Sequence, residues 1–279
     1  MTSVLAAGRL RGAAPHIAVL VVFLIVYIPV IVELVRDWIR DPNYSHGFLI
    51  PLVSGFIIWS RREKLRQLAT SPANLGLLGI LAAGALLILG TAGAEVFTQR
   101  VSMLLALASL TLFLFGWGHL RLAGFPIALM LFAIPLPYVI YYGLTGPLQL
   151  LAAKCAVAAL RFMGVHALAQ GNMIHLPNTS LEVADACSGI RSLYAFLSVG
   201  ALMAYATSGP FMGRLLLFLA TIPLSVAGNA LRVWGTGLGA YFVGPEAAHG
   251  TIHEVFGLTV FAVSLGIFLL VKEVARKLW

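Results

Sequence analysis

The sequence has few charged residues, which make up only 10% of its 279 positions, whereas 60% of its residues are hydrophobic. Soluble globular domains carry about 25% charged residues, so this composition excludes an ordinary soluble protein. The apolar runs are also about 20 residues long. That length crosses a ~30 Å hydrocarbon core as a helix and is too long for barrel strands. The chain is therefore predicted to be an all-α polytopic membrane protein.

Cysteine is also scarce. The two thiols, Cys155 and Cys187, are too few for a disulfide framework, and neither stands in a CxxC pattern. No set of histidine, cysteine and carboxylate residues has ligand spacing, so neither a metal nor another cofactor is expected. The net charge of +8 would suggest nucleic acid in a soluble protein. Here we attribute it to basic loops beside a lipid bilayer, and no nucleic-acid partner is expected.

The apolar runs predict about eight transmembrane helices in a single membrane domain, residues 1–279. The predicted helices lie within residues 13–32, 45–60, 75–94, 101–118, 122–142, 188–207, 215–231 and 253–271. The polar stretch 33–44 and the glycine-rich stretch 233–252 are expected to be loops.

Two segments before Cys187 are different in kind. Residues 144–163 are apolar but contain Lys154 and Arg161, so we expect an interfacial or re-entrant helix whose basic side chains reach toward the headgroups. Residues 166–186 are polar and rich in turn residues. They predict a small extracytoplasmic hairpin that delivers Cys187.

The distribution of basic residues predicts the orientation. With the helices placed as above, the inner segments hold 11 of the 18 basic residues and the outer segments hold 7. Cytoplasmic loops carry the excess of lysine and arginine. Both termini are therefore predicted to be cytoplasmic, and Cys187 is predicted to face the outside.

The most unusual stretch of the chain stands directly before the apolar run 192–207. Within ten residues it gathers two carboxylates, a thiol, a hydroxyl and a guanidinium: Glu182, Asp185, Cys187, Ser188 and Arg191. A thiol near a helix N-terminus and a cation is easily activated as a nucleophile. We therefore take Cys187 as the candidate nucleophile.

Two further polar residues share the predicted outer face. Arg232 ends one predicted helix and His253 starts the next. Ionisable groups at membrane depth are costly and usually functional. A histidine can take the proton of a thiol and later protonate a leaving amine, and an arginine can stabilise an oxyanion. Together with Cys187, these residues predict a cysteine acyltransferase or peptidase.

Structural explanations compete with this one. Cys155 is expected to be a packing residue. Arg232 could be a snorkelling residue at a helix end, and His253 could bond only to loop backbone. Glu182, Asp185 and Arg191 could form an ion-pair network with no further role.

The roles within the site also have rivals. His249 competes with His253 as the base. Arg191 follows Cys187 by four residues, on the same helical face, and competes with Arg232 as the oxyanion group. His46 is expected to cap or line the site rather than to react.

Several motifs of this chain resemble those of the exosortase/archaeosortase family, over roughly residues 13–271. The motifs are Asp41-Pro42-Asn43-Tyr44-Ser45-His46-Gly47, Ile134-Pro135-Leu136-Pro137, Ala186-Cys187-Ser188-Gly189, Asn229-x-x-Arg232, and His253 with Gly257. The resemblance implies an eight-span transpeptidase of the bacterial inner membrane. It implies that Cys187 is the nucleophile, His253 the general acid and base, and Arg232 the transition-state stabiliser.

The resemblance also implies the partners. The substrates would be exported proteins with a C-terminal sorting signal of the PEP-CTERM type: a Pro-Glu-Pro-like motif, a hydrophobic helix and a basic tail. The enzyme would cleave near the motif and pass the new carboxyl terminus to a surface acceptor. Two other functions fit the residues: a purely hydrolytic intramembrane cysteine protease, and a transporter whose polar path is lined by Arg232, His253 and Glu254.

Overall fold

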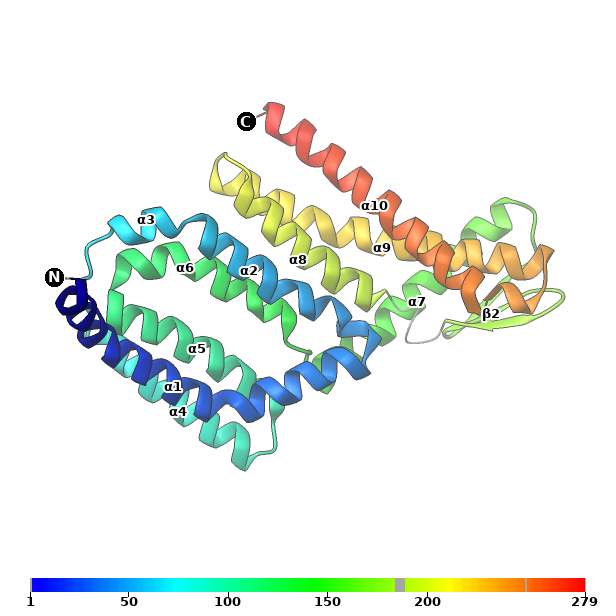
Figure 1. The fold of residues 1–279 in the computed structure, drawn as a ribbon. Coiled ribbons are helices and arrows are strands. Elements are labelled where there is room, and N and C mark those ends of the chain that lie inside the picture. The colour runs from blue at the N-terminus through cyan, green and yellow to red at the C-terminus, as the bar shows by residue number, and fades with distance from the viewer. Residues whose placement is uncertain (1, 184–188, 249, 279) are drawn as a thin grey trace. The chain divides into compact units, whose positions relative to one another are not determined.

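The computed structural model describes residues 2–183, 189–248 and 250–278 (Figure 1). Within these residues, six helices are long and apolar enough to cross a membrane. They are Pro15–Arg40, Leu75–Ala92, Val96–Phe115, Tyr138–Phe162, Phe211–Phe242 and His253–Lys277. Two shorter apolar helices cover Trp117–Ala133 and Ile190–Ala206. The prediction of an all-α polytopic membrane protein is therefore confirmed.

The chain folds into two compact units, Met1–Pro135 and Leu136–Trp279. The elements of the first unit are α1 (Thr2–Arg40), η1 (Pro42–Phe48), α2 (Leu49–Ser60), α3 (Arg62–Gln67), α4 (Leu75–Ala92), α5 (Val96–Phe115), α6 (Trp117–Leu129) and η2 (Met130–Ala133). Helices α4 and α5 approach closely at Gly76, where a Cβ would lie 2.5 Å from the backbone nitrogen of Phe113. Small residues allow such close packing of membrane helices.

The short helix η1 is attached to the end of η2. Asp41 caps η1 by accepting a hydrogen bond from the backbone N–H of Asn43 at 2.8 Å. The indole of Trp38 donates to the carbonyl of Ala133 at 2.7 Å, and Nε2 of His46 lies 3.2 Å from the carbonyl of Phe132. Trp38 of α1 and His46 of η1 thus contact consecutive carbonyls at the end of η2.

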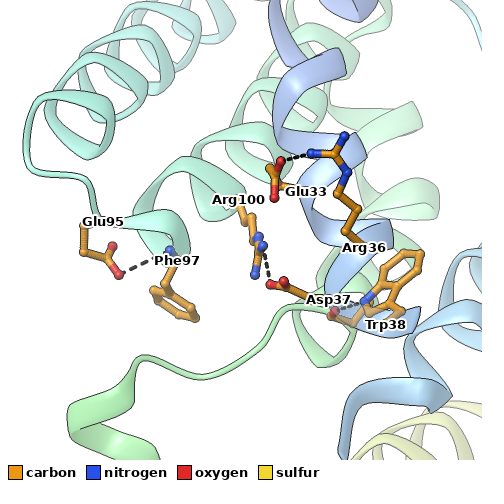
Figure 2. A network of polar contacts seen from close by, with 8 residues as sticks. Glu33, Arg36, Asp37, Trp38, Glu95, Phe97 and Arg100 are labelled. Carbon is orange, nitrogen blue, oxygen red and sulfur yellow. Dashed lines mark hydrogen bonds and ion pairs between the residues drawn. The ribbon is translucent and has the colours of Figure 1, made fainter. Parts of the chain in front are cut away.

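An ion pair between α1 and α5 lies in the interior of the first unit (Figure 2). The guanidinium of Arg100, whose side chain is 3% exposed, donates to Oδ2 of Asp37 at 2.6 Å. An exposed pair, Glu33 with Arg36, lies on the same helix as Asp37. A charge in a membrane helix is costly unless it is paired, so Asp37 makes the burial of Arg100 tolerable.

The second unit holds the segments that the sequence analysis singled out around Cys187. Its elements are α7 (Tyr138–Phe162), β1 (Leu168–Gln170), β2 (Met173–His175), β3 (Ser180–Glu182), α8 (Ile190–Ala206), α9 (Phe211–Phe242), η4 (Pro245–Ala248) and α10 (Gly250–Leu278). The strands form an antiparallel sheet in the order β1-β2-β3. The predicted hairpin is present within residues 166–183, and β1 adds a strand to it.

The sheet packs on α7 and α9. Ile174 and Leu181 on its inner face are buried in one apolar cluster with Leu160 of α7 and with Val233 and Ala240 of α9. This burial stabilises the small sheet, because three short strands without an apolar partner surface have little stability of their own in water.

Three predicted boundaries are wrong. Helix α1 continues through most of the expected loop 33–44, and α9 continues into the expected loop 233–252 as far as Phe242. The helix predicted within 122–142 is divided among α6, η2 and α7, and Pro135 and Pro137 interrupt the backbone between η2 and α7.

Helix α7 contains all but the last residue of the segment 144–163, for which an interfacial or re-entrant placement was predicted. The helix has 25 residues, and its length and composition suffice for a crossing. The interfacial or re-entrant placement of this segment stays a prediction.

Candidate functional site

The site is centred on a contact between α9 and α10. Nη2 of Arg232 lies 2.9 Å from Nε2 of His253, and Oγ1 of Thr236 lies 3.2 Å from Nδ1 of the same ring. Arg232 and Thr236 are four residues apart and therefore share one face of α9. His253 lies in the first turn of α10. Two helices thus place a guanidinium, an imidazole and a hydroxyl in one chain of contacts.

The chemistry of arginine determines the tautomer of His253. A guanidinium only donates hydrogen bonds, so Nε2 of His253 must be the acceptor. The proton of the neutral ring then lies on Nδ1, which donates to Oγ1 of Thr236. Thr236 was not expected at the site, because the sequence placed it in the expected loop 233–252, where a threonine carries no motif signal.

Gly257 makes room for the guanidinium of Arg232. It lies one turn after His253 on α10, and a Cβ at this position would lie 2.8 Å from both Cζ and Nε of Arg232. Any larger residue would displace the guanidinium or the helix. The motif position four residues after His253 is therefore a glycine because a side chain there would collide with Arg232.

The guanidinium of Arg232 has a hydrogen-bond donor without an acceptor among the described residues. Its Nε is buried and has no hydrogen-bond partner among the described residues. The ion pairs found within those residues do not include Arg232 either. A buried donor without a partner is costly, so this Nε is available to a substrate group. Arg100 and Arg214 also have a buried Nε without a partner among the described residues, so this feature is not unique to Arg232.

A small cavity lies beside these groups. Arg232, Thr236 and His253 line it on one side, and residues of the sheet and its exit, Ile174, Leu181, Glu182 and Val183, line it on the other. Its volume is about 20 Å³, which is room for about one water molecule. Apolar walls strengthen the electrostatic effect of the guanidinium.

The start of α8 packs on the same helix, α9, one turn before Arg232. Gly189 precedes α8 with φ +86°, and a Cβ there would lie 2.7 Å from Cγ of Asn229. Asn229 is 7% exposed. Glycine is therefore required at position 189 both by its left-handed backbone and by the contact with Asn229.

Four predicted residues lie outside the described part of the chain: Asp185, Cys187, Ser188 and His249. The described chain before this segment ends at Val183, which lines the cavity of Arg232 and His253. It resumes at Gly189, against Asn229. The residues on both sides of the candidate nucleophile thus belong to the surroundings of the site.

The other predicted residues have varied positions. Glu182 lines the cavity and accepts a hydrogen bond from the side-chain amide of Asn172 at 3.2 Å. Arg191 lies in the first turn of α8. His46 belongs to the first unit, and burial lowers the pKa of its imidazole, against the opposing effect of the carbonyl of Phe132. Cys155 is exposed on α7, so the prediction that it is a packing residue is wrong.

Comparison with known families identifies one that matches most of the chain. Residues 38–270 match the family described as transmembrane exosortase. Comparisons with curated proteins and with solved structures found no match.

Proposed function

The chain belongs to the transmembrane exosortase family, and we propose that it is a cysteine transpeptidase that cleaves a C-terminal sorting signal from exported proteins. In this proposal Cys187 is the nucleophile, His253 the general acid and base, and Arg232 the stabiliser of the oxyanion. The observation that carries the proposal is the contact chain Arg232–His253–Thr236, with the unpartnered Nε of Arg232.

The reaction begins with proton transfer from the thiol of Cys187 to Nε2 of His253. The thiolate attacks the carbonyl carbon of the scissile peptide bond, and the carbonyl oxygen becomes an oxyanion that accepts hydrogen bonds from Arg232. The intermediate then collapses: the C–N bond breaks, and the His253 imidazolium gives its proton to the leaving amine. The product is a thioester between Cys187 and the exported protein.

A second acyl transfer releases the enzyme. The amine of a surface acceptor attacks the thioester carbonyl and loses a proton to His253, and the sulfur of Cys187 leaves and is reprotonated. A water molecule in place of the amine gives hydrolysis, which is the activity of the intramembrane protease alternative. The cavity beside His253 has room for about one water, which favours this second candidate when no acceptor is bound.

Arg232 must change partners during the cycle. Its Nη2 contacts Nε2 of His253, and the same nitrogen of the ring has to accept the thiol proton. Movement of the guanidinium toward the substrate oxygen frees Nε2 and offers the unpartnered Nε to the oxyanion. Thr236 keeps the ring in place during this exchange by holding Nδ1–H.

The length of α9 supports a site at the edge of the bilayer. Arg232 lies about 31 Å from Phe211 along the helix axis, which is the thickness of the hydrocarbon core. A substrate whose hydrophobic helix lies in the bilayer would present its scissile bond at this depth. We propose that this edge is the periplasmic one and that both termini are cytoplasmic, as the distribution of basic residues predicts.

Loss of the tail from a tagged test protein measures the activity. We expect co-expression of the chain with an exported protein carrying a Pro-Glu-Pro-type tail to remove the tail, and Cys187→Ala to abolish its removal. Cys155→Ala is the matched control, because this second thiol is exposed on α7 and should not matter. Continued processing by the Cys187→Ala variant would overturn the proposed nucleophile.

A further inference from the structure

A second and larger hollow lies at the end of α7, at residues that do not line the cavity of Arg232 and His253. This cleft has a volume of about 490 Å³ and opens to the surface. The last turn of α7, the connection 164–167, and residues of β1 and β2 line it. Pockets of 300–1,000 Å³ are the usual size for small-molecule groups.

Basic side chains line the cleft. They are Arg161, His166 and His175, and the described residues that line it include no acidic side chain. Nε of Arg161 donates to the carbonyl of Ala167 at 2.7 Å, which anchors the guanidinium at the cleft. No other hydrogen bond of the Arg161 side chain lies within the described residues, so its two terminal nitrogens can donate to an anion.

Apolar side chains beside the cleft are strongly exposed. Phe162, Met163 and Leu168 are 94%, 53% and 55% exposed. They lie within two residues of Arg161 or His166 in the sequence, so nitrogen-bearing and apolar side chains share the same end of α7. Three large apolar side chains next to a basic cleft are typical of a surface that contacts lipid.

Depth along α9 places this cleft near the headgroups. Leu160 of α7 packs beside Gly237, which lies about 39 Å from Phe211 along α9. The hydrocarbon core is ~30 Å thick, and the bilayer with its headgroups is ~40–45 Å. With Phe211 at the inner hydrocarbon edge, the outer headgroup layer would end at about 35–38 Å. An upright α9 would place the end of α7 at the outer limit of this layer, and the usual tilt of about 20° would bring it closer to the lipid phosphates.

We propose that the cleft binds the phosphodiester of an anionic phospholipid, with Arg161 as its main ligand. The guanidinium donates to two phosphate oxygens, and His166 and His175 add hydrogen bonds. Phe162, Met163 and Leu168 contact the apolar part of the same lipid at the boundary between headgroup and acyl chain. Bound lipid would hold the sheet at the membrane surface. It would thereby also hold the end of β3, after which the chain continues to Cys187. The proposal stands independently of the peptidase activity.

Titration of the purified full-length chain with short-chain lipids tests the assignment. The chain is kept in a non-ionic detergent, and retained ligand is measured by native mass spectrometry. We expect dihexanoyl phosphatidylglycerol to bind more tightly than inorganic phosphate, which lacks acyl chains, and than dihexanoylglycerol, which lacks the phosphate. An acidic peptide of similar charge is expected to bind more weakly still, and equal or tighter binding of that peptide would overturn the lipid assignment.

Variants locate the binding. Arg161→Gln should weaken phosphatidylglycerol binding about fivefold, the loss expected for one basic side chain near a headgroup. Lys154→Gln is the matched control, because Lys154 is exposed on the same helix and does not line the cleft. His166→Gln should weaken binding without touching the Arg161–Ala167 bond, which guards against a loss caused by local unfolding of Arg161→Gln. Unchanged binding in both cleft variants would refute the proposal.

Discussion

Arg232 donates from Nη2 to Nε2 of His253 at 2.9 Å, across the contact between α9 and α10. The contact orients two groups that the proposed reaction uses at different moments. It also keeps Nε2 occupied until the guanidinium moves toward a substrate oxygen. In the proposed reaction, binding of a substrate carbonyl would therefore have to break this contact.

Thr236→Val tests the tautomer of His253. Valine has nearly the shape of threonine but cannot accept the Nδ1 proton, so the ring loses its orientation. We expect the rate of tail removal to fall about fivefold to tenfold, which corresponds to one lost hydrogen bond of about 1 kcal/mol. Thr236→Ser keeps the hydroxyl and should restore most of the rate. Equal rates for valine and threonine would show that Nδ1 needs no acceptor.

Gly257→Ala tests the steric role of Gly257. The new Cβ would lie 2.8 Å from Cζ of Arg232 and would push the guanidinium away from His253. Complete loss of an oxyanion donor costs about 10²–10³ in rate, so partial displacement of the guanidinium should slow tail removal by about tenfold or more. Gly266→Ala is the matched control on the same helix, because no atom lies within 4 Å of its new Cβ. A similar loss in both variants would point to helix α10 in general rather than to Arg232.

Asp37→Asn tests the ion pair inside the first unit. It leaves the buried guanidinium of Arg100 without its counter-charge, which is costly because Arg100 is only 3% exposed. We expect a loss of about 3 kcal/mol in the free energy of unfolding, at the lower end of the range for broken buried pairs because Asp37 is 39% exposed.

Glu33→Gln is the control for Asp37→Asn. It removes the exposed pair with Arg36 on the same helix and should cost at most about 1 kcal/mol. Thermal unfolding in detergent measures both variants. Equal shifts in Tm would mean that the Arg100–Asp37 pair stabilises the folded state no more than an exposed ion pair does.

The lowered pKa of His46 leads us to expect that the stability of the protein depends on pH. Burial lowers the pKa of its imidazole below the usual value of 6.5, although hydrogen bonds to the backbone at Phe132 and Asn43 oppose the shift. The folded state therefore binds this proton less tightly than the unfolded state does. The contribution of His46 to stability is fully present above pH 6.5 and is lost as the pH falls from 6.5 toward the folded pKa.

Comparison of Tm at pH 7.5 and pH 5.5 measures the effect of His46. His46→Gln carries no titrating group at this position, so the drop in Tm on acidification should be smaller than in the unchanged chain. His119→Gln is the control, because it also removes an imidazole bound to a backbone carbonyl, that of Phe115. An undiminished drop in His46→Gln would assign the acid sensitivity to other groups.

The sequence by itself determined the class of the protein and the site residues worth testing. Runs of about 20 apolar residues must form helices in a bilayer, because backbone groups in lipid have no other hydrogen-bond partners. Polar residues that stand at the ends of such runs are conspicuous for the same reason. Arg232 and His253 could therefore be singled out, and the short strands before Cys187 could be predicted from their turn residues.

Only the tertiary structure decided which groups meet. The sequence analysis ended a helix at Leu231, whereas α9 continues to Phe242, because the sheet buries Val233 and Ala240 on its far end. The rotation of α9 about its axis relative to α10 then brings the hydroxyl of Thr236 within hydrogen-bond distance of Nδ1 of His253. Local sequence carries no record of that rotation, because it is set by packing between helices rather than by the residues of either helix alone.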